Sequence, residues 1–325
     1  MPLTADPAAG VTLEDVRAAA RAIEGVAVRT PLIEVPALDV RAGVPVALKC
    51  EQLQPIGAFK IRGAYNAISR VARAGGARGV VTQSSGNHGQ AVAYAARAFG
   101  LRAVVVMPAS TPGIKVDGVR RHGGEVVFAG AIRSHEQLER AEAIASEEGL
   151  AMIPPFDHPD VVAGQGTCGL EIMEQRPDVD TILVPVSGGG LLAGISVAVA
   201  AIKPSTRVVA VEPAGAPKLT AALAAGAPRT LERTESMADG LLTRSIGSFT
   251  FPIIRRVVRQ AVQVTEDEIA DAVRFLHREA ALRVEPSGAV TTAAILAGRL
   301  ALSGPTVAVV SGGNVDPDLF HRLAE

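Results

Sequence analysis

Apolar and polar positions along the chain follow two alternating patterns. Short runs rich in valine, isoleucine and leucine recur, and alanine-rich segments with apolar residues at helical spacing separate them. Strands that alternate with helices in this way indicate parallel sheets covered by helices on both faces, which is an α/β fold. The predicted strands are residues 44–51, 79–82, 103–107, 125–128, 181–186, 207–212, 261–264 and 306–310, and the predicted helices are residues 12–23, 89–99, 113–122, 134–148, 167–175, 191–202, 266–283 and 288–301.

The domain organisation has to be inferred from this alternation of strands and helices, because no linker marks a boundary. No repeat of fixed period and no low-complexity stretch interrupts the 325 residues, which are enough for two domains. We expect two parallel-sheet α/β domains, with the smaller one inserted into the larger one. The predicted large domain consists of residues 1–80 and 158–325, and the predicted small, mobile domain consists of residues 81–157.

Composition removes several classes of function. The formal net charge of -1 argues against a nucleic-acid surface, and the absence of tryptophan argues against a platform that stacks single-stranded bases. Apolar segments such as 191–202 are too short and too often interrupted to span a bilayer. Cys50 and Cys168 form neither a disulfide framework nor a metal-ligand spacing, and the first residues lack the features of a signal peptide. We expect a cytoplasmic protein without nucleic-acid or membrane partners.

Lys60 lies in an unusual setting for a cation. It stands between Phe59 and Ile61, and the segment 57–64 is otherwise rich in glycine and alanine. The chain contains 5 lysines against 27 arginines, and only a lysine can lose its proton when burial lowers the pKa of its amine. This favours a lysine that forms a Schiff base with a carbonyl compound. The alternative is a lysine whose stem lies along an apolar surface with its amine in water.

Three glycine-rich loops follow predicted strands, at residues 84–89, 187–191 and 311–314. In open parallel sheets, ligands bind outside the carboxyl ends of strands. The backbone N–H groups and hydroxyls of the first loop suit a carboxylate, and the bare backbone of the second suits a phosphate. Each loop alone could be an ordinary turn from strand to helix. Together with Lys60, the three loops indicate a ligand site.

The second loop also fits a different pattern. Gly188, Gly190 and Ala193 match the dinucleotide fingerprint G-x-G-x-x-A, and Glu212 ends the next predicted strand, where an acid that binds ribose would lie. This pattern predicts a nicotinamide-dependent oxidoreductase. It assigns no role to Lys60 or to the loop at 84–89, which counts against it.

Five segments together resemble one known family. Residues 57–64, 84–89, 163–167, 187–191 and 311–314 occur in the order and at the separations of the serine/threonine dehydratase and serine racemase family, over about Thr30 to Asp316. The resemblance implies the fold type II, tryptophan synthase β-like architecture and pyridoxal phosphate as cofactor. It implies a dehydratase, or ammonia-lyase, that converts L-threonine, L-serine or a related 3-hydroxy amino acid to a 2-keto acid and ammonia. It also implies a homodimer or homotetramer.

The resemblance assigns roles to individual residues. Lys60 would bind the cofactor covalently and move the α-proton of the substrate, Phe59 would pack against the cofactor ring, and Ser311 would meet the pyridine nitrogen. A neutral hydroxyl at that nitrogen does not keep it protonated, which favours prompt loss of a β-leaving group. The implied cofactor residues are Phe59, Lys60, Asn87 (at the 3-oxygen), Gly188, Gly189, Gly190 and Leu191 (at the phosphate), Gly240, Glu285 and Ser311. The implied substrate residues are Ser84, Ser85, Asn87, His88, His135 and Arg244.

Ser85 leaves two alternative activities open, which are serine (amino-acid) racemisation and 3-hydroxyaspartate dehydration. The resemblance places a serine here in racemases and 3-hydroxyaspartate dehydratases, where it can act as an acid or base on the face opposite Lys60. The alternative is that Ser85 only binds the substrate carboxylate. Arg244 could recruit an acidic substrate such as 3-hydroxyaspartate. A β-replacement synthase is disfavoured because His88 follows Asn87, and a silent ligand-binding regulator is disfavoured because Lys60 is present.

The chain departs from the family pattern at two places. Glu212 and Ala216 match the start of a divalent-cation loop, but Lys218 stands where a second carboxylate is expected. A lysine there would repel a metal ion, and its ammonium could replace one. Pro55 and Ile56 stand where racemases activated by nucleotides have polar residues. These departures make activation by a divalent cation or a nucleotide doubtful.

Overall fold

The computed structural model describes residues 10–132 and 135–325 and contains two sheets. The larger sheet is parallel except for the antiparallel pair of its first two strands, and the smaller sheet is parallel throughout. The strand order of the larger sheet is β1 (Leu32–Glu34), β2 (Val46–Cys50), β10 (Thr306–Val310), β7 (Thr181–Pro185), β8 (Arg207–Pro213) and β9 (Ala261–Val264). That of the smaller sheet is β5 (Glu125–Phe128), β4 (Arg102–Met107), β3 (Gly79–Gln83) and β6 (Ala151–Met152).

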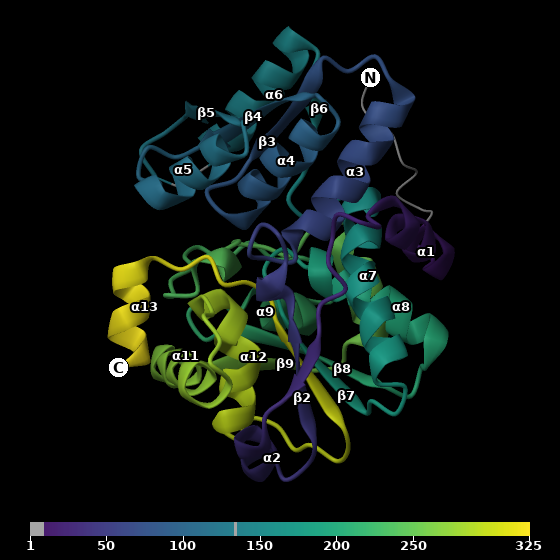
Figure 1. The fold of residues 1–325 in the computed structure, drawn as a ribbon, viewed down its shortest axis with the longest axis vertical. Coiled ribbons are helices and arrows are strands. Elements are labelled where there is room, and N and C mark those ends of the chain that lie inside the picture. Colours follow the sequence, from purple (N-terminus) through teal and green to yellow (C-terminus); the bar gives the residue numbers. More distant parts are fainter. Residues whose placement is uncertain (1–9, 133–134) are drawn as a thin grey trace.

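Helices cover both faces of the larger sheet, as Figure 1 shows. One core packs the sheet against α2, α11 and α12, and the other packs it against α7, α8 and α10. The helices are α1 (Leu13–Ala22), α2 (Pro36–Ala42), α3 (Lys60–Ala74), α4 (Asn87–Ala98), α5 (Gly113–Arg121), α6 (Glu136–Glu148), α7 (Pro159–Gln175), α8 (Gly190–Ile202), α9 (Lys218–Ala225), α10 (Thr250–Val257), α11 (Glu266–Ala280), α12 (Pro286–Leu296) and α13 (Pro317–Ala324), with the short 3-10 turns η1 (Glu51–Leu53) and η2 (Asp239–Leu241).

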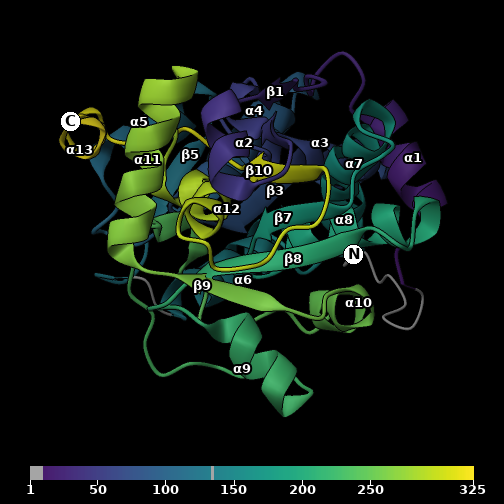
Figure 2. The ribbon, with the colours of Figure 1, turned by 90° about the horizontal axis from the view of Figure 1, so that it is seen from below.

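The predicted α/β fold is confirmed, and all the predicted strands form. Helices α3 to α6 accompany the smaller sheet, which lies above the larger sheet in Figure 1. Figure 2 shows α9 beside β9, at the edge of the larger sheet. The division at residues 80/81 and 157/158, and the mobility of the smaller part, stay predictions. Within residues 10–132 and 135–325, no helix combines the length and hydropathy that a membrane span requires.

Several predicted boundaries are wrong. Helix α7 begins at Pro159 and not at residue 167, because His158 caps its first turn and a proline suits the first helical position. The predicted helix 288–301 starts at Pro286 and ends at Leu296, and the predicted helix 266–283 ends at Ala280. The predicted start at residue 134 lies outside the described residues, and α6 begins at Glu136. The sequence pattern did not predict β1, β6, α2, α3, α9, α10 and α13.

Candidate active site

Lys60 is the first residue of α3 and lies at the carboxyl end of β10. Ala58 forms an antiparallel bridge with Gly312, and the N–H of Phe59 donates to the carbonyl oxygen of Ser311 at 3.1 Å. The Lys60 Nζ donates to the carbonyl oxygen of Pro155 at 2.6 Å. Burial lowers the pKa of this amine to about 8, so a usable fraction is neutral and nucleophilic near neutral pH. The Ala58 and Phe59 contacts bring the segment around Lys60 next to the third glycine loop.

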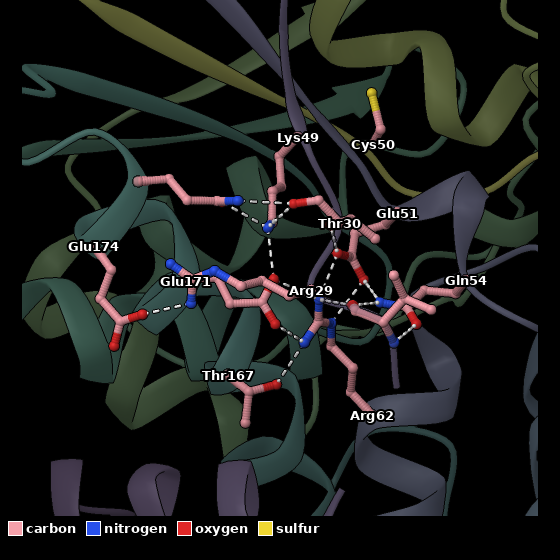
Figure 3. A network of polar contacts seen from close by, with 12 residues as sticks. Arg29, Thr30, Lys49, Cys50, Glu51, Gln54, Arg62, Thr167, Glu171 and Glu174 are labelled. Atoms are coloured by element: carbon pink, nitrogen blue, oxygen red, sulfur yellow. Dashed lines mark hydrogen bonds and ion pairs between the residues drawn. The ribbon is translucent and has the colours of Figure 1, made fainter. Parts of the chain in front are cut away.

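A buried ion network holds the segment that begins at Lys60 (Figure 3). Phe59, the N-cap of α3, makes no side-chain hydrogen bond to the first turn. Instead the fully buried guanidinium of Arg62 donates to both carboxylate oxygens of Glu51, at 2.7 and 2.8 Å, and to Glu171 at 2.7 Å. Burial alone would raise the pKa of Glu51, but the Arg62 guanidinium holds it below its usual value. The network ties α3 to η1 and α7.

The second glycine loop ends in an open helix N-terminus. Helix α8 begins at Gly190, and its N-cap, Gly189, has a φ of 98° and no side-chain cap, so the first N–H groups of the helix are available to an anion. The Gly188 carbonyl oxygen accepts a hydrogen bond from the Thr250 hydroxyl at 2.8 Å, which holds the loop in place. A Cβ on Gly188 would lie 2.4 Å from the ring of Phe156, so only glycine fits there.

The residues Pro155 and Phe156 connect Lys60 to this loop. Pro155 accepts the hydrogen bond of the Lys60 amine, and Phe156 packs against Gly188 and Gly190. The sequence reading missed both, because nothing in the segment between β6 and α7 marks it as functional. The loop is further held by Asp157, which accepts from the N–H groups of residues 248 to 250 at 3.0 to 3.1 Å.

Asn87 and Glu285 meet across 198 positions of sequence. The Asn87 Nδ2 donates to Glu285 Oε1 at 2.7 Å, and its Oδ1 accepts from Nδ2 of Asn314 at 2.8 Å. Burial, reinforced by the charge of Asp239, raises the pKa of Glu285 to about 8, so this carboxyl is protonated at neutral pH. Asn314 was not predicted as a site residue, although it ends the third glycine loop.

Ser311 and Gly240 both contact Ser287, another residue that was not predicted. The Ser311 hydroxyl is buried and 3.4 Å from the Ser287 carbonyl oxygen, and the Gly240 N–H donates to the Ser287 hydroxyl at 2.9 Å. Asn87, Glu285, Ser311 and Gly240 are thus linked through loops at the carboxyl ends of β3 and β10 and the start of α12.

The loop at residues 84–88 leads into α4, which begins at Asn87 and has no side-chain cap at Gly86. The Ser84 hydroxyl accepts from the N–H of Gly86 at 3.3 Å. His88 is buried and its Nε2 lies 3.0 Å from the carbonyl oxygen of Ile153, so Nε2 carries the hydrogen. Burial and the nearby Lys60 charge lower the pKa of His88 to about 3, which keeps the ring neutral. The ring therefore anchors the loop and offers no charge to a carboxylate.

These features together would suit a phosphorylated carbonyl compound. An amine with a lowered pKa, a glycine loop at a helix N-terminus and a buried neutral hydroxyl converge at the carboxyl ends of parallel strands. The family model described as "Pyridoxal-phosphate dependent enzyme" matches residues 23–312. The chain belongs to this pyridoxal-phosphate-dependent enzyme family. The predicted fold type II architecture and family are confirmed.

Relatives of this pyridoxal-phosphate-dependent enzyme carry several activities in their names. The chain is 42% identical to the L-threonine ammonia-lyase of Thermotoga maritima, over 96% of this chain and 78% of that protein. It is 39% identical to the L-threo-3-hydroxyaspartate ammonia-lyase of a Pseudomonas species, over 95% and 97% of the two chains. The structure of maize serine racemase matches with a TM-score of 0.93 and 37% identity, and covers 97% of each chain.

The residues present fit the cofactor that the family requires. The Lys60 amine can bond to the aldehyde carbon, and the open N-terminus of α8 can hold the phosphate. One N–H of Asn87 is used by Glu285, which leaves the other for the 3-oxygen. Ser311 offers a neutral hydroxyl, and the Phe59 ring centroid lies 5.2 Å from the Lys60 Nζ. Roles of the individual residues stay predictions.

Two predicted substrate residues lie in other surroundings. His135 is exposed and pairs with Glu139 at 3.1 Å, and Arg244 is exposed and donates to the carbonyl oxygen of Leu231 at 2.7 Å. In the ranges 10–132 and 135–325, their hydrogen bonds and ion pairs do not reach Lys60 or the glycine loops. A role of either residue in substrate binding stays a prediction.

The predicted cation loop does not fit a divalent metal ion. Glu212 accepts hydrogen bonds from the first turn of α9, and Ala216 accepts one from the buried Lys218 ammonium at 2.9 Å. Nowhere in the described ranges do three His, Cys, Asp or Glu side chains come together as metal ligands. Mg²⁺ and Ca²⁺ bind carboxylate, carbonyl and water oxygens, and here the Glu212 carboxylate and the Ala216 carbonyl oxygen are already engaged by α9 and by the Lys218 ammonium.

Proposed function

We propose that this enzyme is a threonine/serine ammonia-lyase, which converts L-threonine, L-serine or a related 3-hydroxy amino acid to a 2-keto acid and ammonia. The observation that supports the proposal is the bridge between Ala58 and Gly312, which joins the segment just before Lys60 to the third glycine loop at the end of β10. The name of the Thermotoga maritima relative supports it.

Each group has a distinct task in this reaction. Pyridoxal phosphate, when bound, supplies an aldehyde carbon and a ring that accepts the electron pair released at the substrate Cα. Lys60, displaced by substrate, takes the α-proton, because its lowered pKa makes the neutral amine available. The Ser311 hydroxyl would be the neutral partner of the pyridine nitrogen and would not keep that nitrogen protonated. The open N-terminus of α4 binds the substrate carboxylate.

Serine racemisation is the second candidate. The likeness to maize serine racemase supports it, and Ser85 stands in the loop before α4, where a second acid or base would act. A 3-hydroxyaspartate substrate would need a cation near the side chain, and the exposed Arg244 bonds instead to Leu231. We further propose a cytoplasmic homodimer or homotetramer. Closure of residues 81–157 is also proposed, supported by the ion pair of Lys115 in α5 with Asp239 in η2.

Proton NMR in deuterated water tests the proposal. The holoenzyme is given L-serine and then L-threonine, and a keto acid as main product is the expected result. Loss of the α-proton signal without keto acid would favour the racemase. Lys60→Ala should abolish turnover and the visible absorption band of the lysine-bound cofactor, and undiminished activity would refute the assignment. Ser85→Ala should spare dehydration more than racemisation, and equal loss of both would limit Ser85 to carboxylate binding.

A further inference from the structure

Lys218 lies just beyond the end of β8 with its side chain fully buried. Its Nζ donates to the carbonyl oxygen of Ala216 at 2.9 Å and lies 3.8 Å from Oε2 of Glu212, which is equally buried. Taking an ammonium and a carboxylate out of water is costly unless specific partners replace the water. These ions have such partners, so the arrangement is a built ionic site.

Both oxygens of Glu212 are used by the first turn of α9. Oε2 accepts from the N–H of Leu219 at 2.9 Å, and Oε1 accepts from the N–H and the hydroxyl of Thr220 at 2.9 and 2.7 Å. The carboxylate therefore lies at the positive end of the helix dipole, and the Lys218 ammonium adds a full positive charge. Little lone-pair capacity remains for a metal ion.

The charge balance of this site is complete without a metal ion. Two carboxylates would match the two charges of Mg²⁺ or Ca²⁺, whereas Glu212 has only Lys218 as its ionic partner among the described residues, and the pair is neutral. A divalent ion within reach of Glu212 and Ala216 would stand next to the ammonium. Coulomb repulsion at that distance would oppose its binding.

The site also fixes the loop that leads away from β8. Gly215 accepts a hydrogen bond from the N–H of Glu235 at 3.0 Å, and a Cβ on Gly215 would lie 2.0 Å from the Glu235 carbonyl oxygen. The segment that starts at Glu235 therefore passes directly against this loop. It continues to Gly240, whose N–H donates to the Ser287 hydroxyl at the active site.

We propose that the Lys218 ammonium is a built-in cation that takes the place of a divalent metal ion, so that the enzyme needs neither Mg²⁺ nor Ca²⁺. Lys218 is a positioning residue. It acts through the loop at Ala216 and Gly215 on the segment that carries Gly240.

The test replaces the Lys218 ammonium by a second carboxylate, which should create a binding site for a divalent metal ion. Holoenzyme with Lys218→Asp is compared with wild type at pH 7, with EDTA or with millimolar CaCl₂ or MgCl₂, by thermal unfolding and calorimetric Ca²⁺ titration. The variant should have a lower Tm in EDTA and gain several degrees with Ca²⁺, because an ion that binds only the native state raises its stability. Wild type should show no Ca²⁺ binding and no shift in Tm.

Two further variants separate charge from general damage. Lys218→Met should lower the Tm without rescue by Ca²⁺ and should alter the visible circular dichroism of the bound cofactor, because the segment of Gly240 loosens. Lys203→Asp is the matched control, since the hydrogen bonds of the Lys203 ammonium in the described chain go only to the carbonyl oxygens of Pro177 and Val179. It should lower the Tm without rescue and leave the cofactor spectrum unchanged.

Three results would overturn the proposal. They are saturable Ca²⁺ binding to wild type, a Tm of Lys218→Asp that Ca²⁺ does not raise, and a cofactor spectrum that Lys218→Met leaves unchanged. A Lys218→Asp chain that fails to fold even with Ca²⁺ counts with the second result. None of these measurements needs turnover, so failure here is distinguishable from failure of the proposed reaction.

Discussion

Replacing Arg62 by methionine tests the network that holds the start of α3. The Arg62 guanidinium is fully buried and bonds both oxygens of Glu51 and both oxygens of Glu171. Methionine keeps much of the apolar stem and removes the charge. Glu51 then keeps only neutral hydrogen bonds, from the Thr30 hydroxyl at 2.6 Å and the Gln54 amide at 3.2 Å. The buried Glu51 carboxylate loses its ion-pair partner, and only the positive charge of Lys49 remains nearby.

The loss of stability in Arg62→Met follows from the unpaired charge of Glu51. Removing one partner of a buried ion pair costs about 3–5 kcal/mol, so Arg62→Met should lower the free energy of unfolding by about 4 kcal/mol. The loss at Glu171 adds less, because the Lys49 Nζ stays 2.5 Å from it. Glu51→Gln should destabilise wild type and yet stabilise the Arg62→Met protein, because the neutral amide removes the unpaired charge.

Urea unfolding followed by far-ultraviolet circular dichroism, with excess pyridoxal phosphate, measures these free energies. Arg102→Met is the matched control, because Arg102 also pairs with two carboxylates, Glu125 and Glu148, but is 40% exposed. Surface pairs contribute about 0–1 kcal/mol, so the control should change little. The reasoning is refuted if both arginine variants lose equal stability, or if Glu51→Gln further destabilises Arg62→Met.

Three other predictions concern the cofactor site. The rate at which cofactor-free enzyme captures pyridoxal phosphate should rise with pH through about 8 and then level off, because the Lys60 amine attacks only when neutral; stopped-flow absorbance measures it, and a rise that continues to pH 10 would contradict it. Glu285 has a folded-state pKa of about 8 against an ordinary 4.5, so its protonated form contributes stability below pH 4.5 that is lost as pH rises through 8. Glu285→Gln should flatten that decline in Tm, and an unchanged profile would exclude this carboxyl as its cause. Gly188→Ala should weaken cofactor affinity by roughly tenfold or more, about 1.4 kcal/mol, because its Cβ would overlap Phe156; equilibrium dialysis checks this, and wild-type affinity would mean that Phe156 moves aside freely.

The sequence alone determined the features that depend only on residues close together along the chain. Strand and helix periodicity is local, so it predicted the α/β fold and every strand of five residues or more in the two sheets. The chemistry of Lys60 and the glycine loops is also local, because it needs one residue type in one short segment. Helix α3 was not predicted, because the segment around Lys60 was interpreted only for the chemistry of its amine, whereas Ile61, Ile68 and Val71 bury one helical face.

Only the tertiary structure decided which distant residues meet. Lys60 reaches Pro155 across 95 positions, and Asn87 reaches Glu285 across 198. Such contacts depend on strand order and on the crossing of loops at the sheet ends, which no local pattern encodes. The tertiary structure also decided the surroundings of the Lys218 charge. Whether Lys218 faces water or a buried carboxylate depends on how α9 packs against the end of β8, because packing determines which side chains meet.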